Sequence, residues 1–312
     1  MNQTKTMCLS KAESSIIKVL LYSDIFKYPL KADEIQKRLD VSVTDTSEIE
    51  ELLQKLAQNK LIQQNGEYFS VNAIQFLDRR LKGNLNAKNN FPRAFEIAEL
   101  ISKFPYVQAV FLSGSISKNF MDDKSDIDFF IITDKNRMWI SRTLLILYKK
   151  IILLNNKEHF CLNYFIDMDH LEIPEQNLFT ATEIVTVIPA FGKNCSTQFY
   201  NANNWVEKYY PNYPKVDVSK LNDHKPSFRS KVESFFSGKL GDWLEPKFMN
   251  LTLNFWKKKF NKIPKEDFDL AMKTEKHASK HHPNNYQKKV LNQLGDFIAD
   301  FEKTNDVSLE PS

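Results

Sequence analysis

Two aspartates separated by one residue, Asp126 and Asp128, begin the apolar run DIDFFIIT. Side chains alternate between the faces of a strand, so both carboxylates are expected on one face, with Cα atoms ~6.7 Å apart. Two partly desolvated anions this close repel each other, and one would take up a proton unless a cation intervened. A hard divalent cation such as Mg²⁺, or Mn²⁺ in its place, prefers carboxylate oxygen together with substrate phosphate. The pair therefore predicts a metal site that also holds a phosphorylated ligand.

A glycine and a serine, Gly114 and Ser115, follow another apolar run, YVQAVFL, and Gly114 precedes Asp126 by twelve residues. A glycine directly after a strand lets the backbone approach a phosphate without a Cβ clash, and free N–H groups at a helix start bind anions. The serine hydroxyl can add a hydrogen bond to a phosphate oxygen. We therefore expect the glycine turn and the aspartate pair, on neighbouring strands, to face one nucleoside triphosphate.

The stretch SGSISKNFMDDKSDIDFFII resembles the core motif of the DNA polymerase β-like nucleotidyltransferase superfamily, at the spacing of its small bacterial members. The resemblance implies that Gly114 and Ser115 bind the nucleotide phosphates and that Asp126 and Asp128 hold Mg²⁺. It covers this motif and the strands around it.

Two more residues enter the expected nucleotide site through this resemblance. Ser125 stands directly before the aspartate pair, as it often does in the family, and Lys118 keeps a positive charge in the segment after Gly-Ser. Asn119 replaces the glycine usual in that segment, so the turn geometry there is expected to differ.

The family also carries a third carboxylate on the next strand, as a metal ligand or as the base for the attacking hydroxyl. Two residues here have the matching apolar flanks, Asn163 in mid-strand and Asp167 at the strand end. They are about 13 Å apart along a strand, so one of them at most can meet the aspartate pair, and the mid-strand location favours Asn163. An asparagine can coordinate a cation but cannot accept a proton.

The strands and helices around the motif alternate, which predicts a small mixed sheet with helices, an α+β or α/β nucleotidyltransferase core over residues 81–200. The expected strands are 106–112, 126–133 and 159–167, and the expected helices are 91–104, 136–156 and 179–188, the last with a capping box from Thr180 to Glu183.

Residues 1–80 resemble a winged helix-turn-helix module: three helices at apolar spacing precede a hairpin signal, Asn65-Gly66. The third helix, with Thr46 or Ser47 as its expected N-cap, carries three glutamates in its first two turns. Acidic side chains at the end that should meet phosphates argue against DNA binding and favour a protein partner.

Residues 201–312 predict a C-terminal helical domain, with helical runs at 228–260 and 285–303. Between these runs lies the polar stretch 273–289, which contains His277, His281 and His282. No cysteine or acidic partner completes a zinc-like set there, so we interpret the stretch as a solvated basic loop.

The composition indicates an ordinary globular protein of 312 residues, with 42% apolar residues and a net charge of +4. That charge is too small to indicate a nucleic-acid or membrane partner. Three cysteines in no spaced pair, and an N-terminal stretch without an apolar h-region, predict a cytoplasmic location. The most apolar stretch, 138–154, contains three basic residues and is shorter than a bilayer span, so we expect a buried helix.

These features lead to a metal-dependent nucleotidyltransferase, which would move a nucleoside monophosphate from a nucleoside triphosphate to an unidentified hydroxyl acceptor. The C-terminal helices would supply the acceptor pocket, as appended helical domains often do in this family. The alternative is a catalytically weak or inactive nucleotide-binding regulator that uses its winged-helix module for contact with protein or DNA. The asparagine at position 163 motivates that alternative.

Overall fold

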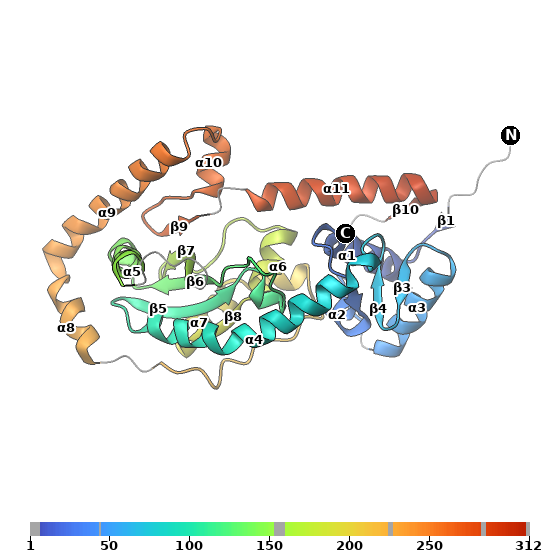
Figure 1. Cartoon of the computed structure of the whole chain (residues 1–312), viewed down its shortest axis with the longest axis horizontal. Coiled ribbons are helices and arrows are strands. Elements are labelled where there is room, and N and C mark those ends of the chain that lie inside the picture. Colours follow the sequence, from blue (N-terminus) through green and yellow to red (C-terminus); the bar gives the residue numbers. More distant parts are fainter. Residues whose placement is uncertain (1–6, 44, 153–159, 224–226, 282–284, 310–312) are drawn as a thin grey trace.

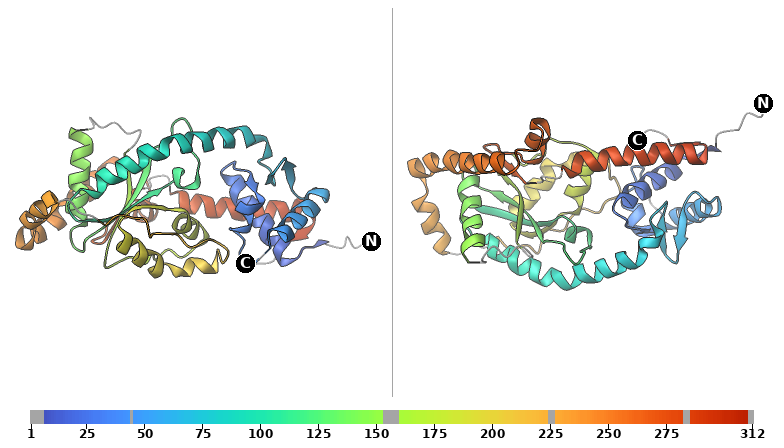
Figure 2. Two further views of the ribbon diagram at one scale, coloured as in Figure 1. Left: turned by 90° about the horizontal axis from the view of Figure 1, so that it is seen from below. Right: turned by 45° about the horizontal axis from the view of Figure 1, so that its top comes forward.

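The structure is a computed structural model that describes residues 7–43, 45–152, 160–223, 227–281 and 285–309. These residues form two bodies, which we call the N-terminal body and the sheet body. Two long helices, α4 (Leu77–Ser102) and α11 (Tyr286–Asn305), extend from one body to the other (Figures 1 and 2).

The N-terminal body packs three helices against a three-stranded antiparallel sheet of order β2-β4-β3. Its helices are α1 (Lys11–Ile25), α2 (Ala32–Gln36) and α3 (Thr46–Gln58), and its strands are β2 (Leu30–Lys31), β3 (Gln63–Asn65) and β4 (Tyr68–Ser70). The predicted order of three helices and a hairpin is therefore present. The core also includes Val290, Leu294 and Phe301 of α11, so the C-terminal helix completes this body.

Two local predictions in this body were wrong by one residue. The N-cap of α3 is Asp45, whose carboxylate accepts a hydrogen bond from the Ser47 backbone N–H at 2.9 Å. The hairpin turn contains Gly66 and the residue after it, because Asn65 still pairs with Tyr68 on the opposite strand. Gly66 takes the positive φ of +59° that the turn requires.

The sheet body contains a five-stranded mixed sheet of order β8-β5-β6-β7-β9. Its strands are β5 (Val107–Ser113), β6 (Asp128–Thr133), β7 (Cys161–Asp167), β8 (Ile188–Phe191) and β9 (Ala278–Lys280). The strands β6 and β7 are parallel, and the other three pairings are antiparallel. The predicted α+β class of this core is confirmed.

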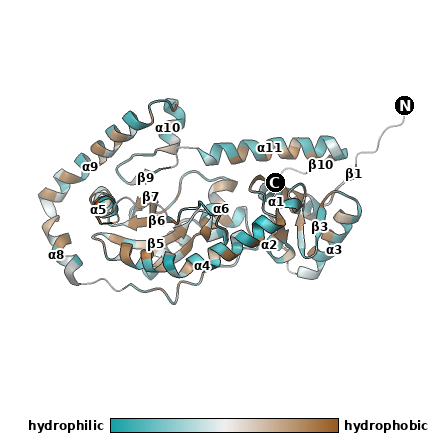
Figure 3. Cartoon of the chain, in the orientation of Figure 1, coloured by the Kyte–Doolittle hydropathy of each residue, from teal (hydrophilic) through white to brown (hydrophobic). Residues whose placement is uncertain are grey.

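Helices cover both faces of this sheet, so the strands are apolar on both sides; Figure 3 colours them mostly hydrophobic and α11 mostly hydrophilic. Val110 and Phe129 pack on one face with α4 and α5 (Met138–Ile151), whereas Phe111 and Phe130 pack on the other. That second face is covered by α6 (Leu178–Thr186), α7 (Lys193–Ala202) and η3 (Asn204–Lys208).

The predicted helix at 179–188 begins earlier than expected, and its capping box is absent. Its N-cap is Asn177, whose side chain accepts a hydrogen bond from the Thr180 backbone N–H at 3.0 Å. Pro189 lies in the edge strand β8 rather than directly after the helix. The carboxylate of Glu183 is therefore not used for capping and is available to another partner.

Residues 201–312 contribute to both bodies. The helices α8 (Ser227–Phe235), α9 (Gly238–Lys259) and α10 (Lys265–Ala271) follow one another along one side of the sheet body, and α9 packs against α5. The buried carboxylate of Glu245 on α9 accepts hydrogen bonds from the first backbone N–H groups of α5, at Trp139 and Ile140. The domain boundaries at residues 80 and 200 stay predictions.

Most of the apolar stretch 138–154 forms α5, with one side buried. Three large side chains of the stretch are exposed: Leu147 and Ile151 on the helix and Ile152 at its C-cap. The last two residues of the stretch, 153 and 154, lie outside the described residues. Within the described ranges, no helix combines the length and the apolar character needed to cross a membrane.

Candidate active site

The turn after β5 brings Gly114 into contact with the first residue of β6. Gly114 has a φ of +66°, and a Cβ atom built on it would lie 2.2 Å from Oδ2 of Asp128. Only a residue without a side chain can therefore form this turn. The chain continues into η2 (Ile116–Lys118) and leaves it through Asn119 at a φ of +55°, so the asparagine adopts the left-handed conformation that glycine would. The backbone thus passes directly over the carboxylate of Asp128.

Asp128 is the central acidic residue of the site. It pairs in register with Ser113 on one neighbouring strand and with Cys161 on the other. Burial is the main reason why the pKa of Asp128 rises from 3.8 to about 6, and the charges of Asp126 and Glu183 act in the same direction. Asp126 lies before the strand begins and is exposed, while Ile127 between the two aspartates is fully buried.

Asn163, rather than Asp167, contacts Asp128. Its Nδ2 donates a hydrogen bond of 2.5 Å to Oδ1 of Asp128, and its Oδ1 accepts one of 3.0 Å from the thiol of Cys161. Burial raises the pKa of Cys161, so the thiol keeps the proton that it donates. The register of β6 and β7 shifts beside Asn163, which makes it the extra residue of an irregularity of the kind that re-aims side chains.

Asp167 lies at the opposite end of β7, where it pairs with Thr133 at the far end of β6. Its carboxylate is buried and accepts a hydrogen bond of 2.7 Å from Nδ1 of His170. The strand length therefore separates Asp167 from Asp128, and the third position next to the aspartate pair is occupied by an amide.

The other two predicted nucleotide-binding side chains, Lys118 and Ser125, are engaged within the protein. The Lys118 ammonium lies 2.9 Å from a carboxylate oxygen of Glu183 and donates to the Gly114 carbonyl at 3.2 Å. The Ser125 hydroxyl accepts a hydrogen bond of 2.8 Å from the Asp122 backbone N–H and thus closes the loop before Asp126. Ser115, directly after Gly114, is half-buried.

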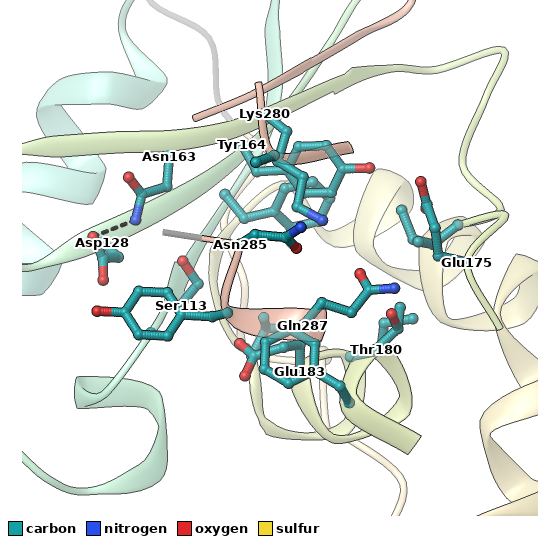
Figure 4. Close-up of a pocket in the computed structure, with 18 of the residues that line it drawn as sticks. Ser113, Asp128, Asn163, Tyr164, Glu175, Thr180, Glu183, Lys280, Asn285 and Gln287 are labelled. Atoms are coloured by element: carbon teal, nitrogen blue, oxygen red, sulfur yellow. Dashed lines mark hydrogen bonds between the residues drawn. The ribbon is translucent and has the colours of Figure 1, made fainter. Parts of the chain in front are cut away.

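A cavity of about 130 Å³ opens beside these residues (Figure 4). Ser113, Gly114, Asp128 and Asn163 form one end of its wall. The rest is formed by α6 and the segments on either side of it, by residues of β6, β7, β9, α7 and α10, and by the start of α11. These residues are Phe130, Tyr164, Ile173, Glu175, Phe179, Thr180, Glu183, Ile184, Val187, Phe199, Ala271, Lys280, Asn285, Tyr286 and Gln287. The cavity thus has an acidic end and a larger, mostly apolar end.

Two carboxylates, those of Asp126 and Asp128, are the side chains that could bind a divalent cation at this site. Asp128 carries a partly desolvated negative charge next to that of Asp126, and the carboxylate atom Oδ2 faces the Gly114 turn. Among the described residues no group of three or more histidine, cysteine, aspartate or glutamate side chains could hold a metal ion. A cation bound here would take its remaining oxygen ligands from phosphate and water, as Mg²⁺ commonly does.

Comparison with known protein families agrees with this geometry. The family model described as polymerase beta, nucleotidyltransferase, matches residues 96–186, which contain the Gly114 turn, both aspartates and Asn163. Residues 96–186 form a nucleotidyltransferase domain of the polymerase β superfamily. No curated protein and no solved structure matches the chain. The nucleotidyltransferase domain supports a transferase-type activity in general.

Two charged residues of the cavity, Glu183 and Lys280, were given other roles from the sequence. Glu183 was assigned to a capping box, but it lines the cavity and pairs with Lys118. Lys280 lies in the stretch 273–289, which was interpreted as a solvated loop; that interpretation was wrong, because Ala278–Lys280 pairs with β7 and His281 packs on Trp256. The five residues HASKH carry no local pattern that would have predicted a strand.

Proposed function

We propose that the protein is a Mg²⁺- or Mn²⁺-dependent enzyme that transfers a nucleoside monophosphate from a nucleoside triphosphate to a hydroxyl acceptor. The observation that carries the proposal is the contact between the Gly114 turn and Asp128, with Asp126 two residues earlier, at the end of a cavity. A backbone that can approach phosphate then lies against a partly desolvated carboxylate, which a cation would stabilise.

Each residue has a defined part in this proposal. Gly114 and Ser115 present backbone N–H groups and a hydroxyl to the phosphates, and Asp126 and Asp128 hold the divalent cation. When bound, that cation neutralises the charge that develops on the phosphate oxygens. Asn163 fixes the orientation of the Asp128 carboxylate through its 2.5 Å hydrogen bond. Because Asn163 cannot accept a proton, the acceptor hydroxyl must lose its proton to another group or to water.

The test is a panel of radiolabelled nucleoside triphosphates, incubated with Mg²⁺ or Mn²⁺ and a cell extract that supplies acceptors. Wild type is compared with the double variant Asp126→Asn/Asp128→Asn. The matched control is Asp122→Asn/Asp123→Asn, since these exposed carboxylates on the same loop pair with Arg79 and Lys82 outside the cavity. We expect label transfer in wild type and control. Transfer that survives in the Asp126/Asp128 variant would contradict the mechanism.

A second candidate is a nucleotide-binding regulator with little or no transferase activity. The observation in its favour is the amide of Asn163 in contact with Asp128, where the family carries a carboxylate. Under this alternative the protein binds a nucleoside triphosphate with Mg²⁺ but releases no pyrophosphate with any acceptor. Calorimetric binding combined with a pyrophosphate-release assay separates the two candidates.

The N-terminal body is proposed to contact a protein partner rather than DNA. On α3 the carboxylates of Glu48, Glu50 and Glu51 are exposed, and Lys55 pairs with Glu13 at 2.8 Å. A helix with this charge repels the phosphate backbone. Fluorescence anisotropy with a duplex DNA library should show no salt-dependent binding, and a complex lost on Glu→Lys changes in α3 would support a basic protein partner.

A further inference from the structure

Lys280, which is half-buried, brings its ammonium group into the larger end of the cavity. It is the last residue of the edge strand β9, where it pairs with Tyr164, and its side chain extends into the cavity beside Asn285 (Figure 4). Desolvation is the main reason why the pKa of Lys280 is lowered. Among the residues that the structure describes, its ammonium forms no ion pair or hydrogen bond.

The two acidic residues whose charges act on the pKa of Lys280 are already paired with other lysines. Glu175 lies 3.2 Å from the ammonium of Lys273, and Glu183 lies 2.9 Å from that of Lys118. The charges that act on the pKa of Lys280 are those of Glu175, Lys273 and Glu183, and Asp128 is not among them. The charge of Glu183 also acts on the pKa of Asp128, so this glutamate is coupled to both ends of the cavity.

The surroundings of Lys280 are mostly apolar and aromatic. Phe130, Tyr164, Phe179 and Phe199 line the same part of the cavity. A charge that is taken out of water into such a lining costs free energy unless a counter-ion and hydrogen bonds replace the lost hydration. A ligand with an anionic group at Lys280 and an apolar body against the aromatic rings would supply both.

We propose that Lys280 binds the anionic group, a phosphate or a carboxylate, of a ligand whose apolar part fills this end of the cavity. This inference rests on the proposed function, because it places the ligand in the cavity of the proposed transferase. It adds the chemical class of that ligand. Two sources are compatible with it: the phosphate tail of the nucleotide, or an anionic acceptor. Binding at Lys280 needs neither Mg²⁺ nor group transfer, so it can be tested separately.

The first arm uses phenyl phosphate as the probe and isothermal titration calorimetry in the presence of EDTA. We expect Lys280→Met to weaken its binding about tenfold or more, because a charge-assisted hydrogen bond is lost. Lys280→Arg should retain most of the affinity. The matched control is Lys276→Met, an exposed lysine four residues earlier on the same segment, which should bind as wild type does.

The second arm compares ATP, with Mg²⁺, against adenosine. If Lys280→Met weakens ATP but not adenosine, the anion is the nucleotide tail. If it weakens phenyl phosphate and leaves ATP unchanged, the anion belongs to the acceptor. If ATP does not bind wild type but phenyl phosphate binds through Lys280, the proposed function fails and this inference stands.

A folding control accompanies both arms. Methionine has a similar length and no charge to desolvate, so Lys280→Met should unfold at the same temperature as wild type or a higher one in the absence of ligand. Phenyl phosphate should raise the unfolding temperature of wild type more than that of the variant. Equal binding of both probes by wild type and Lys280→Met, or no binding of either by wild type, would overturn the proposal.

Discussion

Desolvation raises the pKa of both Asp24, which is buried, and Asp128, which is half-buried, to about 6, yet the surroundings of the two carboxyl groups differ. Asp24 lies on α1 and accepts hydrogen bonds from the Ser70 hydroxyl at 2.8 Å and from the Asn72 backbone N–H at 2.5 Å. These bonds tie α1 to β4 and the residues after it. Asp128 interacts with the side chains of Asn163 and Cys161 on the neighbouring strand, and it borders a cavity and a glycine turn.

The comparison shows that a raised pKa does not by itself identify a functional carboxylate. The hydrogen-bond donors around Asp24 come from the protein, so Asp24 has a structural role that requires no ligand. Asp128 instead lies next to two further negative charges, those of Asp126 and Glu183. What distinguishes the candidate site is therefore a cluster of negative charges beside an open cavity.

The largest expected effect is on transfer activity. Asp128→Asn should reduce nucleotidyl transfer by roughly 10²–10³-fold or more, since it removes charge that holds the cation at the reacting phosphate. Asp24→Asn should leave the rate per folded molecule unchanged, because Asp24 lies outside the cavity. Initial rates with a radiolabelled nucleoside triphosphate measure both. An equal loss of rate in the two variants would contradict the assignment of a functional role to Asp128 and a structural role to Asp24.

The next effect concerns the turn that touches Asp128. Gly114→Ala should lower the free energy of unfolding by about 3 kcal/mol, from the positive φ and from the clash with the carboxylate. Gly66→Ala is the control, because Gly66 also has a positive φ but nothing lies within 4 Å of its added Cβ. That variant should lose about 1 kcal/mol. Chemical denaturation provides both values, and similar losses would show that the contact with Asp128 is unimportant.

The third effect is the pH dependence that Asp24 gives to stability. Its folded pKa of about 6 lies above the ordinary 3.8, so the native state binds the proton more tightly than the unfolded state does. The corresponding stabilisation is present below pH ~4 and is lost as the pH rises through ~6, by at most about 3 kcal/mol. The difference between wild type and Asp24→Asn, measured by denaturation from pH 4 to 7, should follow this curve. A difference that is independent of pH would contradict it.

The smallest effect sharpens the role of Asn163. Asn163→Asp adds a third carboxylate beside Asp128, so without metal it should destabilise the protein by about 1–2 kcal/mol through repulsion. Mg²⁺ should offset this destabilisation, and it should therefore stabilise the variant more than wild type. Thermal unfolding with EDTA measures the destabilisation without metal, and thermal unfolding with Mg²⁺ measures the stabilisation by the cation. Asn163→Ala is the control, in which Mg²⁺ should give no added stabilisation.

The sequence was sufficient to predict the parts of the site that depend on neighbouring residues. The strand before Gly114, the apolar run behind Asp128 and the mid-strand position of Asn163 all follow from local alternation and spacing. Asp126 and Asp128 were predicted on one strand, but β6 begins at Asp128 and leaves Asp126 exposed before it.

The residues that were missed depend on contacts between distant parts of the chain. The strand β9 has three residues and exists because it pairs with β7, more than a hundred residues earlier. A segment this short and polar carries little intrinsic preference for a strand. Glu183 was assigned to a helix cap because its actual partner, Lys118, is 65 residues away in sequence. Tertiary pairing therefore overrode the local pattern in both cases.

The helix α11 gives the molecule a mechanical link between its two ends. Its first turn, at Tyr286 and Gln287, lines the cavity, and its later residues Val290, Leu294 and Phe301 are buried in the core of the N-terminal body. A helix of 20 residues is a stiff rod about 30 Å long. A partner that binds the N-terminal body and shifts α11 would therefore also displace Tyr286 and Gln287 in the distant cavity wall.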